Sequence, residues 1–496
     1  MKDSELLTSV SKTSTDSEFF SPIPPGYKPG KTKYLFVMGT VMSGLGKGIF
    51  SSCLAKLMQD KGLKIAPIKL EGYLNIDSGT LNPFRHGEVF VLDDGMECDM
   101  DLGTYERLLD QDLSRANFCT SGQIFSDVLN KERHGDYLGR DVQMIPHVTG
   151  EVKLRLRNLA MKTNAAVVFV EIGSTVGDLE NAYFIEAMRE LAYEEGPNSA
   201  CFVALTYILE PQTLGEQKSK AAQLGIKQLM QLGVQPDIIA CRATHAVTET
   251  VRQKISVYSN VPLERVISLQ DSASIYTIPA MLRDRGLDFE VARLLKIEDR
   301  LNLRQERKSW AQWCDFTDKI EAAKKPITIG ITGKYTSVRD SYASIINSLE
   351  HADIALGAKV DIKWIDTTNL TDTNVAQHLA DVDGVIVPGG FGTRGTEGKI
   401  CCIKYARENN VPYLGICFGF QMAVIEFARN VCGLNGANST EIEKDCENPV
   451  IDYLPEQLKI EGLGGNMRLG GFDIELKSDT LAWQLFAKSS KIRMRF

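Results

Sequence analysis

Tyr34-Leu35-Phe36-Val37-Met38, a buried-strand pattern, runs directly into Gly39-Thr40-Val41-Met42-Ser43-Gly44-Leu45-Gly46-Lys47-Gly48, a glycine-rich loop that opens a helix. Glycines let backbone N–H groups approach phosphate oxygens, the helix N-terminus adds positive potential, and Lys47 can reach terminal phosphates. This strand–loop–helix order predicts a phosphate-binding loop and disfavours the alternative, a glycine-rich turn with an incidental lysine.

The loop lacks the hydroxyl that usually holds Mg²⁺, because Gly48 stands where Ser or Thr is typical. Carboxylates elsewhere must then hold the metal. Glu97, Asp99 and Asp101 form an acidic turn, and Glu171 follows a buried strand. Each of them alone fits a solvated surface charge. Beside a phosphate loop, one acidic group from each segment would complete an octahedral Mg²⁺ shared with a nucleotide.

Continuous apolar runs alternate with helical stretches along the chain, which indicates α/β architecture with parallel sheets covered on both faces. The runs lie at 66–68, 166–170, 202–206, 238–240 and 266–269, and a second series lies at 327–331, 384–388 and 412–414. We therefore expect a large α/β domain with a P-loop-type parallel sheet, followed by a second, smaller α/β domain. The predicted division is a flexible tail at 1–32, a large domain at 33–296, a charged linker at 297–325 and a small domain at 326–496.

The composition is typical of a globular enzyme, with 43% hydrophobic and 24% charged residues among 496. A net charge of −8 argues against a general nucleic-acid surface. Eleven cysteines without C-x-x-C spacing read as reduced thiols, and no secretory leader or membrane-length apolar run is evident. We expect a cytoplasmic protein with no nucleic-acid or membrane partner.

Leu414-Gly415-Ile416-Cys417-Phe418-Gly419-Phe420-Gln421 predicts a strand-to-helix elbow that exposes a nucleophilic thiol. Gly389 and Gly390 follow a strand, where backbone N–H groups can form an oxyanion hole. Such a cysteine normally needs a histidine base. All six histidines precede it: His86, His134, His147, His245, His351 and His378.

Several further runs, taken together, resemble the CTP synthase family. They are His86-Gly87-Glu88-Val89-Phe90-Val91, Asp99-Met100-Asp101-Leu102-Gly103, Lys131 to Gly139, Val170-Glu171-Ile172-Gly173, Pro388-Gly389-Gly390-Phe391-Gly392 and Ala437-Asn438-Ser439-Thr440-Glu441. Residues 33–290 are similar to the family's synthase domain, and 326–496 to its class I glutamine amidotransferase domain.

The resemblance implies a ligase of pyrimidine biosynthesis. ATP phosphorylates the 4-oxygen of UTP, and ammonia from glutamine displaces phosphate to give CTP. It further implies Mg²⁺, activation by GTP, feedback inhibition by CTP, and a homotetramer with filaments as a further assembly.

The resemblance also assigns residues. As catalytic groups it gives Cys417, Lys47 and Lys69, and as metal ligands Asp101 and Glu171. For ATP it gives Gly44, Leu45, Gly46, Lys47, Gly48, Ile49, Asp101, Gln270, Asp271 and Ser272. For UTP and CTP it gives Ser43, Asp178, Leu179, Glu180, Lys218, Ser219, Lys220, Gln223 and Lys254. For glutamine it gives Gly390, Phe418, Gln421, Glu441 and Arg495, and for GTP the run 465–470.

Four departures from the family pattern stand out. Ala221-Ala222 replaces Pro-Thr between the two nucleotide lysines, Glu71-Gly72 replaces Asp-Pro, Ser174 replaces a glycine, and Met494 replaces a histidine. The first puts pyrimidine affinity and CTP inhibition in question. Glu71 and Ser174 could slow the reaction without removing a catalytic group.

The family's histidine base comes from a Phe-His-Pro-Glu run, which these 496 residues do not contain. We therefore expect this form to make CTP from free ammonia and to hydrolyse glutamine poorly. Two alternatives remain at this point: another P-loop amidoligase acting on carboxylates, and a non-catalytic, nucleotide-binding homologue that regulates or forms filaments.

Overall fold

A computed structural model describes residues 21–137, 140–211, 213, 215–322, 324–334, 338–455 and 468–496. The chain forms two compact units. Unit 1 comprises Met1–Ser78, Phe90–Gln312 and Leu469–Phe496, and unit 2 comprises Gly79–Val89 and Trp313–Arg468.

Unit 1 is built on a seven-stranded sheet with the order β5-β2-β6-β1-β7-β8-β9, in which every neighbouring pair is parallel. The strands are β1 (Lys33–Gly39), β2 (Ile65–Glu71), β5 (Phe118–Thr120), β6 (Val167–Ile172), β7 (Ala200–Tyr207), β8 (Ile238–Ala243) and β9 (Val266–Gln270). Residues of β1, β2 and β6 are buried throughout, which explains their continuous apolar sequence.

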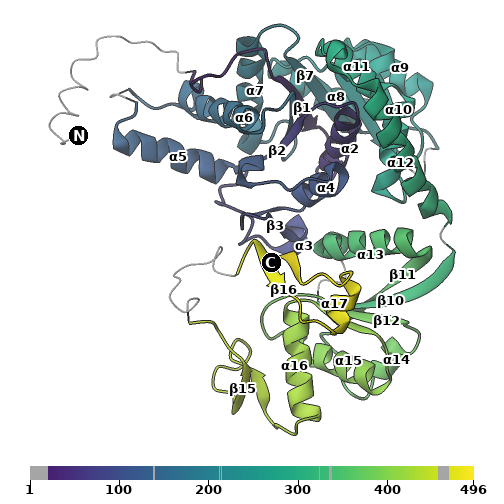
Figure 1. The fold of residues 1–496 in the computed structure, drawn as a ribbon. Helices are drawn as coiled ribbons and strands as arrows, with labels where there is room; N and C mark the ends of the chain where they lie inside the picture. The colour runs from purple at the N-terminus through teal and green to yellow at the C-terminus, as the bar shows by residue number, and fades with distance from the viewer. Residues whose placement is uncertain are drawn as a thin grey trace. The chain divides into compact units, whose positions relative to one another are not determined.

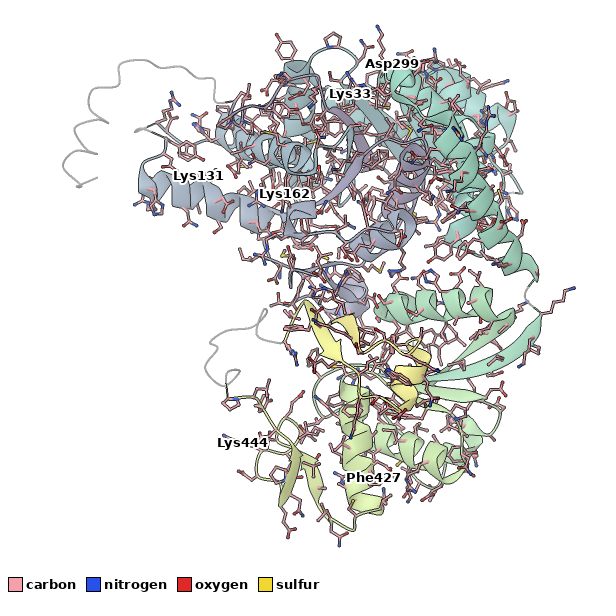
Figure 2. All side chains as sticks on the ribbon, in the orientation of Figure 1. Lys33, Lys131, Lys162, Asp299, Phe427 and Lys444 are labelled. Carbon is pink, nitrogen blue, oxygen red and sulfur yellow. The ribbon has the colours of Figure 1, made fainter. Side chains whose placement is uncertain are left out.

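Helices cover both faces of this sheet: Figure 1 shows α5, α6 and α7 on one side and α2, α4 and α10 on the other. Side chains fill the space between the sheet and the helices (Figure 2). The helices are α2 (Lys47–Asp60), α4 (Asp101–Leu109), α5 (Ser121–His134), α6 (Thr149–Thr163), α7 (Ala182–Glu195), α8 (Lys220–Gln231), α9 (Glu249–Ser259), α10 (Ile278–Asp284) and α11 (Leu287–Leu294). A short pair, β3 (Val89–Val91) and β4 (Glu97–Asp99), precedes α4, and α12 (Leu303–Ala322) follows α11.

Unit 2 has a parallel four-stranded sheet with the order β11-β10-β12-β13, with α13 on one side and α14, α15 and α16 on the other (Figure 1). Its strands are β10 (Lys325–Gly333), β11 (Ala358–Asp366), β12 (Gly384–Val387), β13 (Tyr413–Gly415), and the pair β14 (Ala437–Ser439) and β15 (Asn448–Ile451). Its helices are α3 (Pro83–His86), α13 (Ala343–Leu356), α14 (Val375–Leu379), α15 (Thr396–Glu408) and α16 (Phe418–Asn430).

The predicted α/β class with parallel sheets is confirmed. Residues 469–496, which the sequence assigns to the small domain, instead belong to unit 1 and form β16 (Gly471–Glu475), α17 (Leu481–Leu485) and β17 (Lys491–Arg495). Arg493 explains this placement, because its guanidinium pairs with Asp93 at 2.7 Å. In the described part of the chain, no helix has the length and apolar character needed to cross a membrane.

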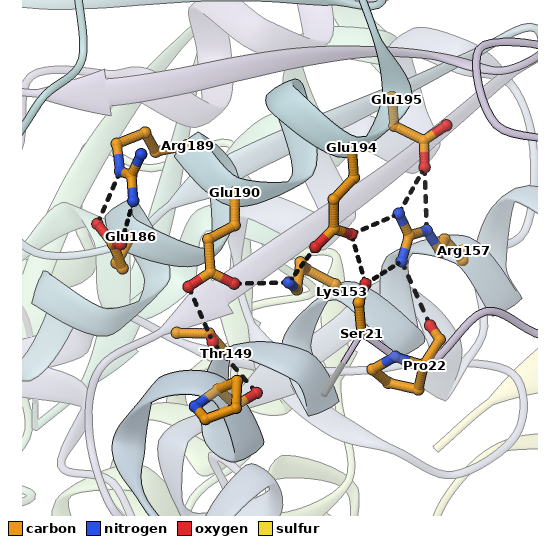
Figure 3. A network of polar contacts seen from close by, with 11 residues as sticks. Ser21, Pro22, Thr149, Lys153, Arg157, Glu186, Arg189, Glu190, Glu194 and Glu195 are labelled. Carbon is orange, nitrogen blue, oxygen red and sulfur yellow. Dashed lines mark hydrogen bonds and ion pairs between the residues drawn. The ribbon is translucent and has the colours of Figure 1, made fainter. Parts of the chain in front are cut away.

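Residues 21–32, part of the tail predicted for 1–32, are anchored to the fold. Residues 1–20 lie outside the described residues, but Arg157, whose side chain is fully buried, donates to the Pro22 carbonyl at 3.3 Å. The same guanidinium pairs with Glu194 at 2.7 Å and Glu195 at 2.9 Å (Figure 3). This network fastens residues 21–32 to α6 and α7.

We expect Arg157→Met to lower the free energy of unfolding by about 3–5 kcal/mol, because it leaves buried carboxylates unpaired. The matched control is Arg189→Met, which breaks a pair with Glu186 on the exposed side of α7 and should cost at most about 1 kcal/mol. Chemical denaturation followed by circular dichroism measures both. Equal losses in the two variants would contradict a stabilising role for the buried network.

Candidate functional site

The predicted phosphate loop joins β1 to α2, the strand–loop–helix order that the sequence indicated. Gly44 and Gly46 have φ values of 71° and 76°, a left-handed conformation that glycine adopts without strain. Lys47 is the first residue of α2, and its buried ammonium group donates to the Ser174 carbonyl at 2.9 Å. The loop thus carries a positive side chain at a helix N-terminus.

Lys69 lies at the centre of a cluster of carboxylates at the carboxyl edge of the sheet. Its Nζ is 3.0 Å from Asp99 and 3.2 Å from Glu71, and it is also paired with Asp101. Glu171, at 3.5 Å, is its register partner on the adjacent strand β6. Parallel strands that end at one edge bring these groups together.

Gly48 makes room for this cluster. A Cβ built on Gly48 would lie 2.5 Å from Cγ of Asp101, a distance that real Cβ atoms do not tolerate. The glycine that replaces Ser or Thr at position 48 therefore lets the Asp101 carboxylate approach the phosphate loop.

Burial and charge act against each other in the cluster. Burial by itself would lower the pKa of Lys69, but the surrounding carboxylates, led by Asp101, hold it well above its usual range. Burial raises the pKa of Glu171 to about 8, while Lys69 outweighs burial at Asp101 and lowers its pKa. Burial also lowers the pKa of Lys47. Shifts of this kind are typical of functional sites.

The donor set fits a divalent cation held together with substrate phosphates. Four carboxylates face two ammonium groups, which leaves net negative charge. Among the described residues, no three His, Cys, Asp or Glu side chains form a ready metal cluster. Mg²⁺ is commonly held by one or two carboxylates plus phosphates, so the predicted pair Asp101 and Glu171 is sufficient in number. Their role as ligands stays a prediction.

Arg242, which is not among the residues predicted from the sequence, joins two of the predicted ATP segments. Its Nε donates to Asp271 at 2.8 Å, and its Nη1 donates to the Gly44 carbonyl at 2.9 Å. The signal that could have found it is a charged residue near the carboxyl end of a buried strand, β8. Gln270 and Ser272 precede and follow Asp271 in the sequence, and this adjacency places them near Arg242.

The residues predicted for UTP and CTP lie in two places. Gln223 and Lys254 line one surface groove, and Lys220 contacts the ring of Tyr258 in the same groove. Lys218 is paired with Glu216. The segment Asp178 to Glu180 lies instead beside β2, where a Cβ on Gly72 would come within 2.9 Å of Glu180. Nucleotide binding at these residues stays a prediction.

Ser174, one of the departures from the family pattern, contacts the phosphate-loop lysine. It has a φ of 61°, in the left-handed region where the family's glycine is unstrained, and its carbonyl accepts the bond from Lys47. Glu71 contacts Lys69, and a Cβ on Gly173 would lie 2.6 Å from its carboxylate. These departures therefore lie within the site.

In unit 2, Cys417 occupies the predicted elbow between β13 and α16. It is exposed, with φ 52° and ψ −108°, a strained conformation for a residue other than glycine. A Cβ on Gly419 would lie 2.0 Å from the Val387 carbonyl, so only glycine fits the turn. Cys417 is the N-cap residue of α16.

The predicted oxyanion residues lie next to this thiol. A Cβ on Gly389 would be 3.7 Å from Cβ of Cys417, and the Gly392 N–H donates to Glu441 at 3.1 Å. Phe418 and Gln421 are in the first turns of α16. The structure thus brings together the predicted nucleophile, the glycine loop and the predicted glutamine carboxylate.

Arg495, predicted to contact glutamine, is in unit 1. Both guanidinium ends of Arg495 are paired in unit 1, with Glu106 and with Asp112 at 2.8 Å, so its predicted contact with glutamine would require those pairs to break. Residues 465–467 of the run 465–470, which is predicted for GTP, lie outside the described residues. His351 packs against Phe316, and His378 is exposed on α14.

Residues 33–297 match the family model for the CTP synthase N-terminus, and residues 337–486 match the model for class-I glutamine amidotransferase. The protein is thus a glutamine-hydrolysing ligase of the amidotransferase-linked class. The chain belongs to the CTP synthase family.

Relatives support this membership over most of the chain. It is 48% identical to the CTP synthase of Pyrococcus furiosus over 457 residues, which covers 92% of this chain and 83% of that one. It is 45% identical to the CTP synthase of Staphylococcus aureus strain NCTC 8325 over 458 residues, with 92% and 84% coverage. A solved glutaminase domain of Trypanosoma brucei CTPS with bound acivicin is 35% identical and covers 34% of this chain and 65% of its own, with a TM-score of 0.32.

Restoring the usual phosphate-loop residue should be harmful here. We expect Gly48→Ser to displace the Asp101 carboxylate and to lower ammonium-fed CTP formation by about a hundredfold, as misplacement of a reacting group does. The control is Gly286→Asn, because Asn tolerates the left-handed φ of 67° at this position and its Cβ would meet open space. Unchanged activity in Gly48→Ser would contradict the steric argument.

The elbow gives a second prediction, on thiol reactivity. In the unaltered protein, iodoacetamide should modify Cys417 faster than Cys432, an exposed thiol without an elbow. Gly419→Ala should reduce the ratio of the two rates to about one, because its Cβ forces the turn away from β12. Peptide mass spectrometry measures the ratio of the two alkylation rates, and an unchanged ratio in Gly419→Ala would contradict the prediction.

Proposed function

We propose that this protein converts UTP to CTP in the cytoplasm, with residues 33–296 as the synthase domain and residues 326–496 supplying the glutaminase module. ATP phosphorylates the 4-oxygen of UTP, and ammonia then displaces the phosphate. The observation that carries the proposal is the Lys69 carboxylate cluster beside the phosphate loop. Phosphoryl transfer depends on positioning and charge neutralisation: the cluster positions Lys69, and its carboxylates suit a Mg²⁺ that would neutralise the phosphates.

Lys47 and Lys69 neutralise charge on the transferred phosphoryl group. Asp101 and Glu171 would hold Mg²⁺, which supplies charge neutralisation between the nucleotide phosphates. Arg242 keeps the phosphate loop and the Asp271 segment in fixed register, which orients ATP. The pyrimidine 4-oxygen is a poor leaving group until it is phosphorylated, which is why activation precedes amination.

UTP, and CTP as inhibitor, bind through Lys218, Lys220, Gln223 and Lys254, whose positive charges suit a triphosphate. The shared groove of Gln223 and Lys254 supports this assignment. Asp178 to Glu180 contacts the nucleotide from the β2 side. We further propose GTP as activator and a homotetramer, which can assemble into filaments, on the basis of family membership.

In unit 2, the Cys417 thiolate attacks the amide carbon of glutamine, and backbone N–H groups of the Gly389–Gly390 loop receive the oxyanion. Glu441 binds the substrate's ammonium group. Cys417 has no hydrogen bond or ion pair with a histidine in the described part of the chain. We therefore propose that these 496 residues work chiefly with free ammonia.

The test is CTP formation from UTP and ATP with ammonium or with glutamine as nitrogen donor. We expect the glutamine-fed rate to be about a hundredth of the ammonium-fed rate or less, as loss of a triad base implies. Equal rates would refute the dependence on ammonia. Lys47→Ala should abolish both rates; if it leaves them unchanged, the synthase assignment fails and a regulatory homologue is favoured.

A further inference from the structure

Lys399 is a buried cation next to the elbow. It lies in the first turn of α15, its residue is 3% exposed, and its Nζ donates to the Pro388 carbonyl at 3.1 Å. Pro388 is the residue immediately before the Gly389–Gly390 loop. The ammonium group also lies 5.1 Å from the centroid of the Phe418 ring, at the start of α16. It therefore contacts both segments that form the glutaminase site.

Lys399, like the phosphate-loop residue Lys47, has no carboxylate partner among the described residues, whereas three other buried lysines do. Lys61, Lys69 and Lys153 each pair with acidic side chains. Lys399 forms no ion pair within the described residues, and its hydrogen bond goes to a neutral carbonyl. A buried charge without a counter-ion is costly, and such charges occur where an anion binds or forms.

The titratable groups that face Lys399 are Lys334 from the end of β10, Cys417 from the elbow, and Cys402 from its own helix. Burial and the charge of Lys334 lower the pKa of Lys399 to about 8, and Cys417 acts in the opposite direction. Below that pH the amine carries a proton, so the anion that it can stabilise is a thiolate or an oxyanion.

We propose that Lys399 is a positioning residue of the glutaminase site, which fixes the Pro388 carbonyl and thus the oxyanion loop, and which places a positive charge beside the Cys417 thiolate. The inference rests on the proposed role of Cys417 as nucleophile. An ammonium group at this position aligns the peptide that precedes the oxyanion donors and favours loss of the thiol proton before attack.

The test uses the full chain and measures the rate of Cys417 alkylation by iodoacetamide between about pH 6 and pH 10, a range that brackets thiol titration. Lys399→Met should move the midpoint of the pH profile upward and slow alkylation near pH 7 by about three- to tenfold. Lys399→Arg keeps a charge and should retain the midpoint of the unaltered protein. A purely structural role would not produce this difference between the two variants.

Lys404→Met is the matched control, because Lys404 is on the same helix and pairs with Asp372 at the surface. It should leave the profile unchanged. Superimposable profiles for Lys399→Met and the unaltered protein would overturn the inference. If Lys399→Met does not fold, a midpoint raised in Lys399→Arg would overturn it instead.

The proposed function is tested separately by Cys417→Ser. If this variant keeps the residual glutamine-fed rate, the nucleophile assignment fails, whereas the alkylation profiles of the Lys399 variants report only on the charge beside the thiol. The two failures are therefore distinguishable.

Discussion

The synthase site depends on the ion pairs between the ammonium group of Lys69 and the carboxylates around it. The ammonium group gathers carboxylates from β2, β6 and the β4–α4 turn, which no local interaction would bring together. Since like charges repel in a buried setting, the carboxylates could not share this volume without the cation. The sheet makes the arrangement available, because Lys69 and Glu171 are register partners. A divalent cation and nucleotide phosphates would bind where the positive charge of Lys69 already offsets part of the carboxylate charge.

The two sites use the same physical device. In each, a glycine removes a Cβ that would block a close approach: Gly48 for Asp101, and Gly419 for the Val387 carbonyl. A buried lysine then supplies positive charge, Lys69 in one case and Lys399 in the other. In each site the glycine leaves space for a close contact, and the positive charge comes from a lysine on a different helix or strand.

Much of this could be predicted from the sequence. Continuous apolar runs identified the parallel strands, and the order of strand, glycine loop and helix located Lys47 and Cys417. The sequence did not reveal residues whose role depends on a hydrogen-bond partner that is distant along the chain. Lys399 and Arg242 look like ordinary helix and strand residues until Pro388 and Gly44 are seen to accept their hydrogen bonds. The contacts of residues 21–32 with Arg157 and of residues 469–496 with Asp93 could not be predicted, because the partners are distant along the chain.

Sequence by itself determined the α/β class, the phosphate loop, the elbow and the resemblance to CTP synthases, because those features are local patterns of apolar spacing and glycine. Tertiary structure alone decided which carboxylates surround Lys69, why Gly48 replaces a hydroxyl residue, and which cation lies beside Cys417. The reason is that burial and Coulomb interaction depend on distances through space, and these distances are set only when the strands and helices have packed.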